Sequence, residues 1–113
     1  MKKLERNRLI AETMKLTIQK TNRGDFIEYV DNDGYGHRDK LDFDKSPRQK
    51  EWIEDWLVEN GFDIEMDRDR NSTIYYIENL ECEFVKGHKL KSEAFLLAVE
   101  ECCKWLKKQN NEK

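Results

Sequence analysis

The stretch SPRQKEWIEDWLVENGFDIEM, residues 46–66, decides the fold. Its first part predicts a helix, because Ser46 and Gln49 form a capping box that satisfies backbone donors at a helix N-terminus. Gly61 predicts the end of this helix, since glycine readily adopts the left-handed conformation that follows a last turn. Residues 62–66 then alternate apolar with polar side chains, the pattern of a half-buried strand. A helix that leads directly into a strand predicts a fold that mixes the two.

The helix predicted in this stretch has one apolar face. Trp52, Ile53, Trp56 and Leu57 fall within about 140° of arc at 100° per residue. We interpret the two tryptophans as core anchors, because a buried aromatic side chain removes a large apolar area from water. The alternative is a platform on which a ligand stacks.

Outward from this stretch, the same periodicities predict two more helices and four more strands. The helices cover residues 3–14 and 92–108. The strands lie at residues 16–18, 26–30, 73–78 and 81–86. This order predicts one mixed α/β (α+β) domain over residues 1–113, a sandwich in which a mostly antiparallel sheet is covered by helices. The polar tail at about 107–113 is expected to fray.

The amino-acid composition narrows the classes of protein to which this chain could belong. The chain has 113 residues, of which 37% are apolar and 40% charged, and its three Trp, five Phe and four Tyr are enough to build a folded core. Its 21 basic and 24 acidic residues are interleaved and give a net charge of −3. A general nucleic-acid binder needs an excess of Lys and Arg, so we do not expect that function.

Membrane segments and metal ligands are not indicated. No apolar run approaches the ~20 residues that cross a bilayer, and no signal-peptide core is present, so we expect a cytoplasmic protein with no membrane partner. Cys82, Cys102 and Cys103 do not form a disulfide framework. With His37 and His88 they show none of the spacings of a zinc site, so we expect no metal and no cofactor. The adjacent pair, Cys102 and Cys103, is interpreted as small apolar filler in a core.

Residues 31–42, DNDGYGHRDKLD, contain four aspartates at nearly the spacing of a calcium loop. Gly36 falls on the position where such a loop needs glycine, but Tyr35 stands where an oxygen ligand is required. The preceding residues 26–30 are β-rich, so no helix enters the loop. Residues 32–34, Asn-Asp-Gly, are instead a strong hairpin signal because all three tolerate positive φ. We therefore predict a hairpin turn here and not a calcium site.

Catalytic motifs are not found. The chain contains no phosphate-binding loop, dinucleotide fingerprint or nucleophile elbow, so we assign no catalytic residue. A small basic cluster at residues 86–91 precedes the last predicted helix. It could hold an anion at that helix N-terminus, and the alternative is a solvated turn.

Three stretches resemble the phage ABA-sandwich domain family, small proteins encoded by phages and prophages of Gram-positive bacteria. Residues 7–14 resemble its opening helix, residues 43–61 its second helix and residues 92–98 its closing helix. The chain differs at residues 15–16, where the family often has Gly-Trp, and at Glu93, where Pro or another small residue often stands. The resemblance implies an α/β sandwich. It assigns no catalytic residues, because most members have no known activity.

From this resemblance we expect a small phage or prophage accessory protein in the cytoplasm of a bacterial host. It would act by binding a host or phage protein, without a cofactor. The alternatives are a small hydrolase that works through carboxylates and a metal, and a homo-oligomeric structural phage protein. Enzymatic activity is therefore not expected but stays open.

Two apolar residues on charged faces suggest where an interface would lie. Leu97 points away from the apolar arc of the last predicted helix, and Val58 stands among acidic residues on the preceding one. A single exposed leucine is ordinary in proteins, which is the alternative. We nevertheless predict a homodimer or a partner surface that uses Leu97 and Val58.

Overall fold

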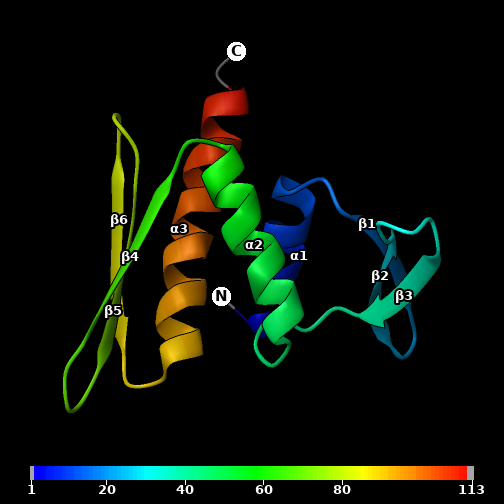
Figure 1. Ribbon diagram of the computed structural model, residues 1–113, viewed down its shortest axis with the longest axis horizontal. Helices are drawn as coiled ribbons and strands as arrows, with labels where there is room; N and C mark the ends of the chain where they lie inside the picture. Colours follow the sequence, from blue (N-terminus) through cyan, green and yellow to red (C-terminus); the bar gives the residue numbers. More distant parts are fainter. Residues whose placement is uncertain (1, 112–113) are drawn as a thin grey trace. The chain divides into compact units, whose positions relative to one another are not determined.

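The computed structural model describes residues 2–111 and has an α+β fold of three helices and two three-stranded antiparallel sheets (Figure 1). The predicted fold class is confirmed. Every strand pair is antiparallel, as expected, but the strands divide between two sheets. The chain falls into two compact units, residues 1–42 and residues 43–113. The single domain expected for residues 1–113 stays a prediction.

The first unit consists of one helix and three strands: α1 (Lys3–Thr13), β1 (Thr17–Thr21), β2 (Gly24–Val30) and β3 (Gly36–Lys40). β2 is the central strand of the sheet, whose order is β1-β2-β3. Ile27 in β2 is fully buried and lies opposite Ile18 of β1 and Asp39 of β3. Alternation along β2 therefore directs Asp25 and Ile27 to the same face of the sheet.

The hairpin between β2 and β3 is organised by Asp31. Its Oδ1 atom accepts the backbone N–H groups of Asp33 and Tyr35 at 2.9 Å each, and its Oδ2 atom lies 2.6 Å from Nε2 of His37. Gly34 has a φ of +89°, the left-handed conformation that the tight turn requires. The hydrogen bond from His37, followed by the backbone donors, lowers the pKa of Asp31. The predicted hairpin turn is confirmed, and the Asp31 carboxylate serves to close it.

Asp25 is almost fully buried and holds α1 on the first sheet. Its carboxylate accepts two hydrogen bonds from Arg8, at 2.7 Å from Nε and 3.2 Å from Nη2. Only 2% of the Asp25 side chain is exposed, against 37% of the Arg8 side chain. The hydrogen bond from Arg8 lowers the pKa of Asp25, although desolvation opposes this shift. The pair therefore stabilises the ionised form of the carboxylate.

Because the folded pKa of Asp25 lies below its unfolded value of about 3.9, the pair stabilises the protein above about pH 4 and this contribution is lost as the pH falls further. We expect Asp25→Asn to lower the urea midpoint near pH 7, and the gap to the wild type to shrink near pH 3. Urea melts at both pH values check this. Asp33→Asn, in the exposed hairpin of the same unit, is the control. An equal loss at both pH values for Asp25→Asn would contradict the assignment.

The second unit contains two helices and three strands: α2 (Pro47–Glu59), β4 (Asp63–Arg68), β5 (Thr73–Glu78), β6 (Glu83–His88) and α3 (Lys91–Asn111). The sheet order is β4-β5-β6, and α3 packs on β5 and β6. Figure 1 shows α2 and α3 on the same side of this sheet. The buried apolar residues of the unit include Ile53, Leu57, Phe62, Tyr75, Ile77, Ala94, Phe95, Leu96, Ala98, Val99, Cys102 and Cys103.

The ends of α2 follow the sequence signals closely. Ser46 is the N-cap residue, and its Oγ accepts the backbone N–H of Gln49 at 3.2 Å. Pro47 occupies the first helical position, where its missing N–H leaves no hydrogen bond unmade. Gly61 follows the last turn with a φ of +85°. Both predicted ends are confirmed.

We expect Ser46→Ala to cost about 1 kcal/mol of unfolding free energy, because the N–H of Gln49 loses its acceptor. Ser46→Gly should cost only a few tenths of a kcal/mol, since glycine is tolerated at an N-cap. Urea denaturation of both variants measures the difference. No measurable loss for the alanine variant would show that the cap contributes little.

Three features of the second unit differ from the sequence prediction. Trp52 and Trp56 are half buried, and the fully buried residues of α2 are instead Ile53 and Leu57. β6 begins and ends two residues later than predicted, because the side chain of Asn79 accepts backbone N–H groups in the preceding turn. α3 continues to Asn111 and so includes most of the tail expected to fray, while residues 112–113 lie outside the described residues.

Candidate functional site

The outward face of the second sheet carries an unusual set of side chains. Strand pairing places its residues in three rows, Asp63–Glu78–Glu83, Glu65–Tyr76–Val85 and Asp67–Ile74–Gly87. The alternate residues of the same strands, among them Ile77 and Tyr75, face α3. We call these nine outward positions the acidic face. Five of the nine are carboxylates, and none is Lys or Arg.

Charge is fully sorted between the two sides of this sheet. Every Asp and Glu of β4, β5 and β6 lies on the acidic face. Every cationic or imidazole side chain of these strands lies in the inward rows, and these are Arg68, Lys86 and His88. The chain as a whole has a net charge of only −3. The negative charge of this sheet is therefore concentrated on its outward surface.

The row of three carboxylates is electrostatically unfavourable at neutral pH. Like charges on directly opposite residues of neighbouring strands destabilise a sheet. The hydrogen bond with Glu83 is the largest cause that raises the pKa of Glu78, and the charges of Glu83, Glu65 and Asp63 add to it. A raised pKa means that the folded state favours the protonated form of Glu78. Ionising all three carboxylates near pH 7 therefore works against folding.

The centre of the acidic face is apolar. Val85 is 42% exposed, while Ile74 and Tyr76 are half buried. The hydroxyl of Tyr76 donates a long hydrogen bond of 3.5 Å to Oδ2 of Asp67. An apolar centre with a charged rim is the usual anatomy of a surface that binds another protein.

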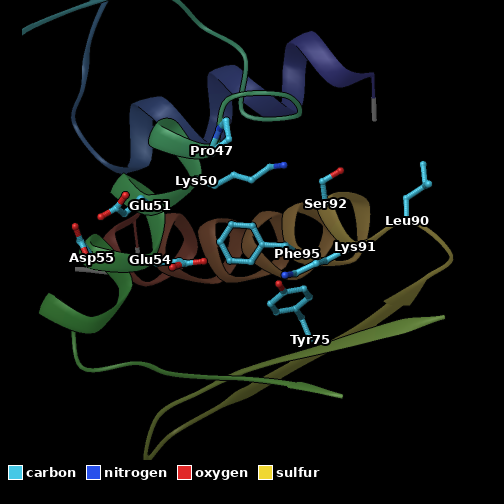
Figure 2. Close-up of a pocket in the computed structure, with 10 residues that line it drawn as sticks. All are labelled: Pro47, Lys50, Glu51, Glu54, Asp55, Tyr75, Leu90, Lys91, Ser92 and Phe95. Atoms are coloured by element: carbon cyan, nitrogen blue, oxygen red, sulfur yellow. The ribbon is translucent and has the colours of Figure 1, made fainter. Parts of the chain in front are cut away.

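A groove of about 740 Å³ opens on the other side of the sheet, between α2, β5 and the start of α3. Figure 2 shows Phe95 and Tyr75 in its middle, and their ring centroids are 5.2 Å apart. Lys50 extends toward the end of the groove where α3 begins, and the side chain of Lys91 runs back toward the Tyr75 hydroxyl (Figure 2). We call this the α2–α3 groove.

The charged groups of the α2–α3 groove have no ionic partners in the part of the chain that the structure describes. Lys50 and Lys91 form no ion pair there. The same holds for the three carboxylates of the groove, Glu51, Glu54 and Asp55. Figure 2 shows the Glu54 carboxylate directed toward Phe95 and those of Glu51 and Asp55 directed away. The groove therefore has a cationic end and an anionic end.

Tyr75 contributes a free donor to this groove. The residue is only 7% exposed, and its hydroxyl makes no hydrogen bond to another residue among positions 2–111. Burial is the main cause that raises the pKa of Tyr75, and the charge of Glu54 adds to it. The hydroxyl therefore stays protonated near neutral pH and can donate a hydrogen bond to a ligand.

The two residues predicted for an interface differ in exposure. Val58 is 63% exposed on α2, which fits a contact residue. Leu97 is half buried on α3, so its side chain is less exposed than its charged neighbours in the sequence had suggested. The association predicted through Leu97 and Val58 stays a prediction.

Cys102 and Cys103 are fully buried, and burial raises the pKa of Cys102, as suits an apolar filler and not a nucleophile.

Sequence reasoning did not identify the acidic face or the groove. The signal for the acidic face was present, since acidic residues alternate with apolar ones along residues 63–67. Its full extent depends on how three strands align. The groove collects residues from three separate elements, and of these only Leu90 and Lys91 belong to a local sequence feature, the basic cluster at residues 86–91.

Within residues 2–111, no three His, Cys, Asp or Glu side chains are grouped so that they could hold a metal ion. None of the helices in this part of the chain combines the length and the apolar character needed to cross a bilayer. Comparison with protein-family models, curated proteins and solved structures gives no match for this chain.

Proposed function

We propose that this chain is a protein-binding module whose acidic face docks on a basic surface of a partner protein. The observation that carries the proposal is the complete sorting of charge in the second sheet, with all five carboxylates outward. Complementary charge steers two proteins together and selects against partners of the same sign. The apolar centre around Tyr76 and Val85 supplies area that becomes buried on docking.

The carboxylate row explains why a basic partner fits. Asp63, Glu78 and Glu83 lie side by side in the free protein. The hydrogen bond with Glu83 is the largest cause that raises the pKa of Glu78, and the neighbouring charges add electrostatic repulsion. Lys or Arg side chains of a partner would relieve it on binding. Two copies of the acidic face would instead bring ten carboxylates together, so the partner is a different protein.

The cellular role that we propose is that of a phage or prophage accessory protein acting on a host or phage protein. Its support is the resemblance of residues 7–14, 43–61 and 92–98 to helices of the phage ABA-sandwich family. A homodimer through Val58 uses a surface on α2 and is compatible with a heterologous partner on the acidic face.

A basic amphipathic peptide tests the proposed face directly. The probe alternates lysine with leucine, and the control peptide has the same composition in scrambled order. In two-dimensional amide NMR spectra we expect the alternating peptide to shift the signals of Tyr76, Val85 and their neighbours. Affinity should fall steeply with added salt, because exposed charge interactions are screened. Shifts that map elsewhere, or equal binding of the scrambled peptide, would argue against this face.

A pair of charge-reversal variants makes the test specific to the face. Glu65→Lys lies in the central row beside Tyr76, and we expect about tenfold weaker peptide binding for each close charge pair that is lost. Glu59→Lys makes the same charge reversal at an exposed position of α2, away from the acidic face, and should weaken peptide binding much less. Both variants should then be used to capture partners from infected or lysogenic host lysate. Equal weakening by both variants would mean that net charge, and not this face, governs binding.

A further inference from the structure

We infer that the α2–α3 groove binds a small molecule that carries a phosphate monoester at one end and a primary ammonium group at the other. This site is separate from the proposed docking surface, because Tyr75 lies on the face of the sheet opposite the acidic face. Its volume of about 740 Å³ is within the range of small-ligand pockets.

The phosphate end of the site lies where α3 begins. Tyr75, a residue that is only 7% exposed, presents to this end from the middle of the groove a hydroxyl that has no hydrogen-bond acceptor among residues 2–111. Lys50 and Lys91 add two ammonium groups without ionic partners in the same part of the chain. The first N–H groups of the 21-residue helix α3 have no acceptor within the helix, and its dipole favours an anion at this end. The Tyr75 hydroxyl and the two ammonium groups belong to three elements, β5, α2 and α3, and so reach the groove from different sides.

The charge of the groove decides between an anion and a zwitterion. The two lysines match the charge of a phosphate monoester, which is about −1.5 to −2 near pH 7. An anion alone would nevertheless face Glu54, whose carboxylate points toward Phe95 in the same groove (Figure 2). An ammonium group on the ligand turns this repulsion into attraction. A zwitterion therefore satisfies both ends, and a simple anion satisfies only one.

The spacing within the ligand follows from α2. Lys50 and Glu54 are four residues apart on this helix, which corresponds to about 6 Å along its axis. This separation is the usual one for an ion pair on a helix surface, but the two side chains are not paired and extend into the groove. A ligand whose phosphate and ammonium groups are separated by a short flexible chain spans this distance.

A series of aminoalkyl phosphates, from aminoethyl to aminohexyl, tests the inference by calorimetric titration of the full chain. Hexyl phosphate, hexylamine and inorganic phosphate provide the anion or the cation alone. We expect the best aminoalkyl phosphate to bind about tenfold more tightly than hexyl phosphate, because it gains one charge-assisted hydrogen bond. Equal affinities for the two, or no binding of any aminoalkyl phosphate at millimolar concentration, would overturn the inference.

Variants assign the two ends of the ligand. Glu54→Gln should remove the advantage of the aminoalkyl phosphate over hexyl phosphate, whereas Glu59→Gln on the same helix should keep it. Lys91→Met and Tyr75→Phe should weaken both ligands several-fold, and Lys104→Met, farther along α3, should weaken neither. Tyr75→Phe keeps the ring packed on Phe95, so its fold is preserved and the loss reports the hydroxyl. An advantage that survives Glu54→Gln would show that Glu54 does not hold the ammonium group and would overturn the assignment.

Discussion

Replacing Ile77 with alanine should lower the free energy of unfolding by about 3–4 kcal/mol, the largest loss that we expect from a single truncation in the second sheet. Ile77 is fully buried on β5, the central strand, between Ile64 of β4 and Phe84 of β6. Its removal leaves a cavity beneath α3 that these neighbours cannot fill by small shifts. Urea denaturation followed by circular dichroism measures the loss.

Ile74→Ala is the matched control, because it changes the same residue type in the same strand on the opposite face. Ile74 is half buried on the acidic face, opposite Asp67 and Gly87. We expect a loss of about 1 kcal/mol there, since less apolar area is removed from the folded state. If Ile74→Ala were as costly as Ile77→Ala, the outward face would be covered by something other than solvent.

Leu57→Ala should cost about 3 kcal/mol and exceed the effect of Trp56→Ala, even though tryptophan is the larger residue. Leu57 is fully buried on α2, while Trp56 is only half buried. Truncating a half-buried ring removes contacts on one side only, so we expect about 2 kcal/mol for Trp56. Urea melts of the two variants test this order. A greater loss for Trp56→Ala would show that Trp56 is a core anchor, as the sequence predicted.

The sequence predicts the local parts of this fold well, because their signals lie within a few residues. The cap at Ser46, the stop at Gly61 and the hairpin turn at residues 32–34 depend only on neighbouring backbone groups. Strand β5 is predicted at its exact bounds, Thr73–Glu78, because apolar and aromatic residues fill it. In each case local chemistry and the final fold agree.

The nonlocal features could not be predicted in the same way. Periodicity shows that a segment is a strand but not which sheet it joins. For this reason the sequence predicted a single sheet where the structure has two. It also shows that a tryptophan lies on the apolar side of a helix but not how deep that side is buried, as Trp52 and Trp56 illustrate. The acidic face and the α2–α3 groove both depend on alignment between segments that are distant in the chain.

The acidic face has a further consequence for association between copies of this chain. β4 and β6 are the two edges of the second sheet, and such edges can pair with strands of another molecule and lead to aggregation. Outward carboxylates occupy both edge strands, Asp63, Glu65 and Asp67 on one and Glu83 on the other. Any fibril-like stacking of these sheets would have to bring those charges together. The repulsion that weakens the isolated sheet therefore also keeps its copies apart at neutral pH, and this protection weakens as the carboxylates become protonated.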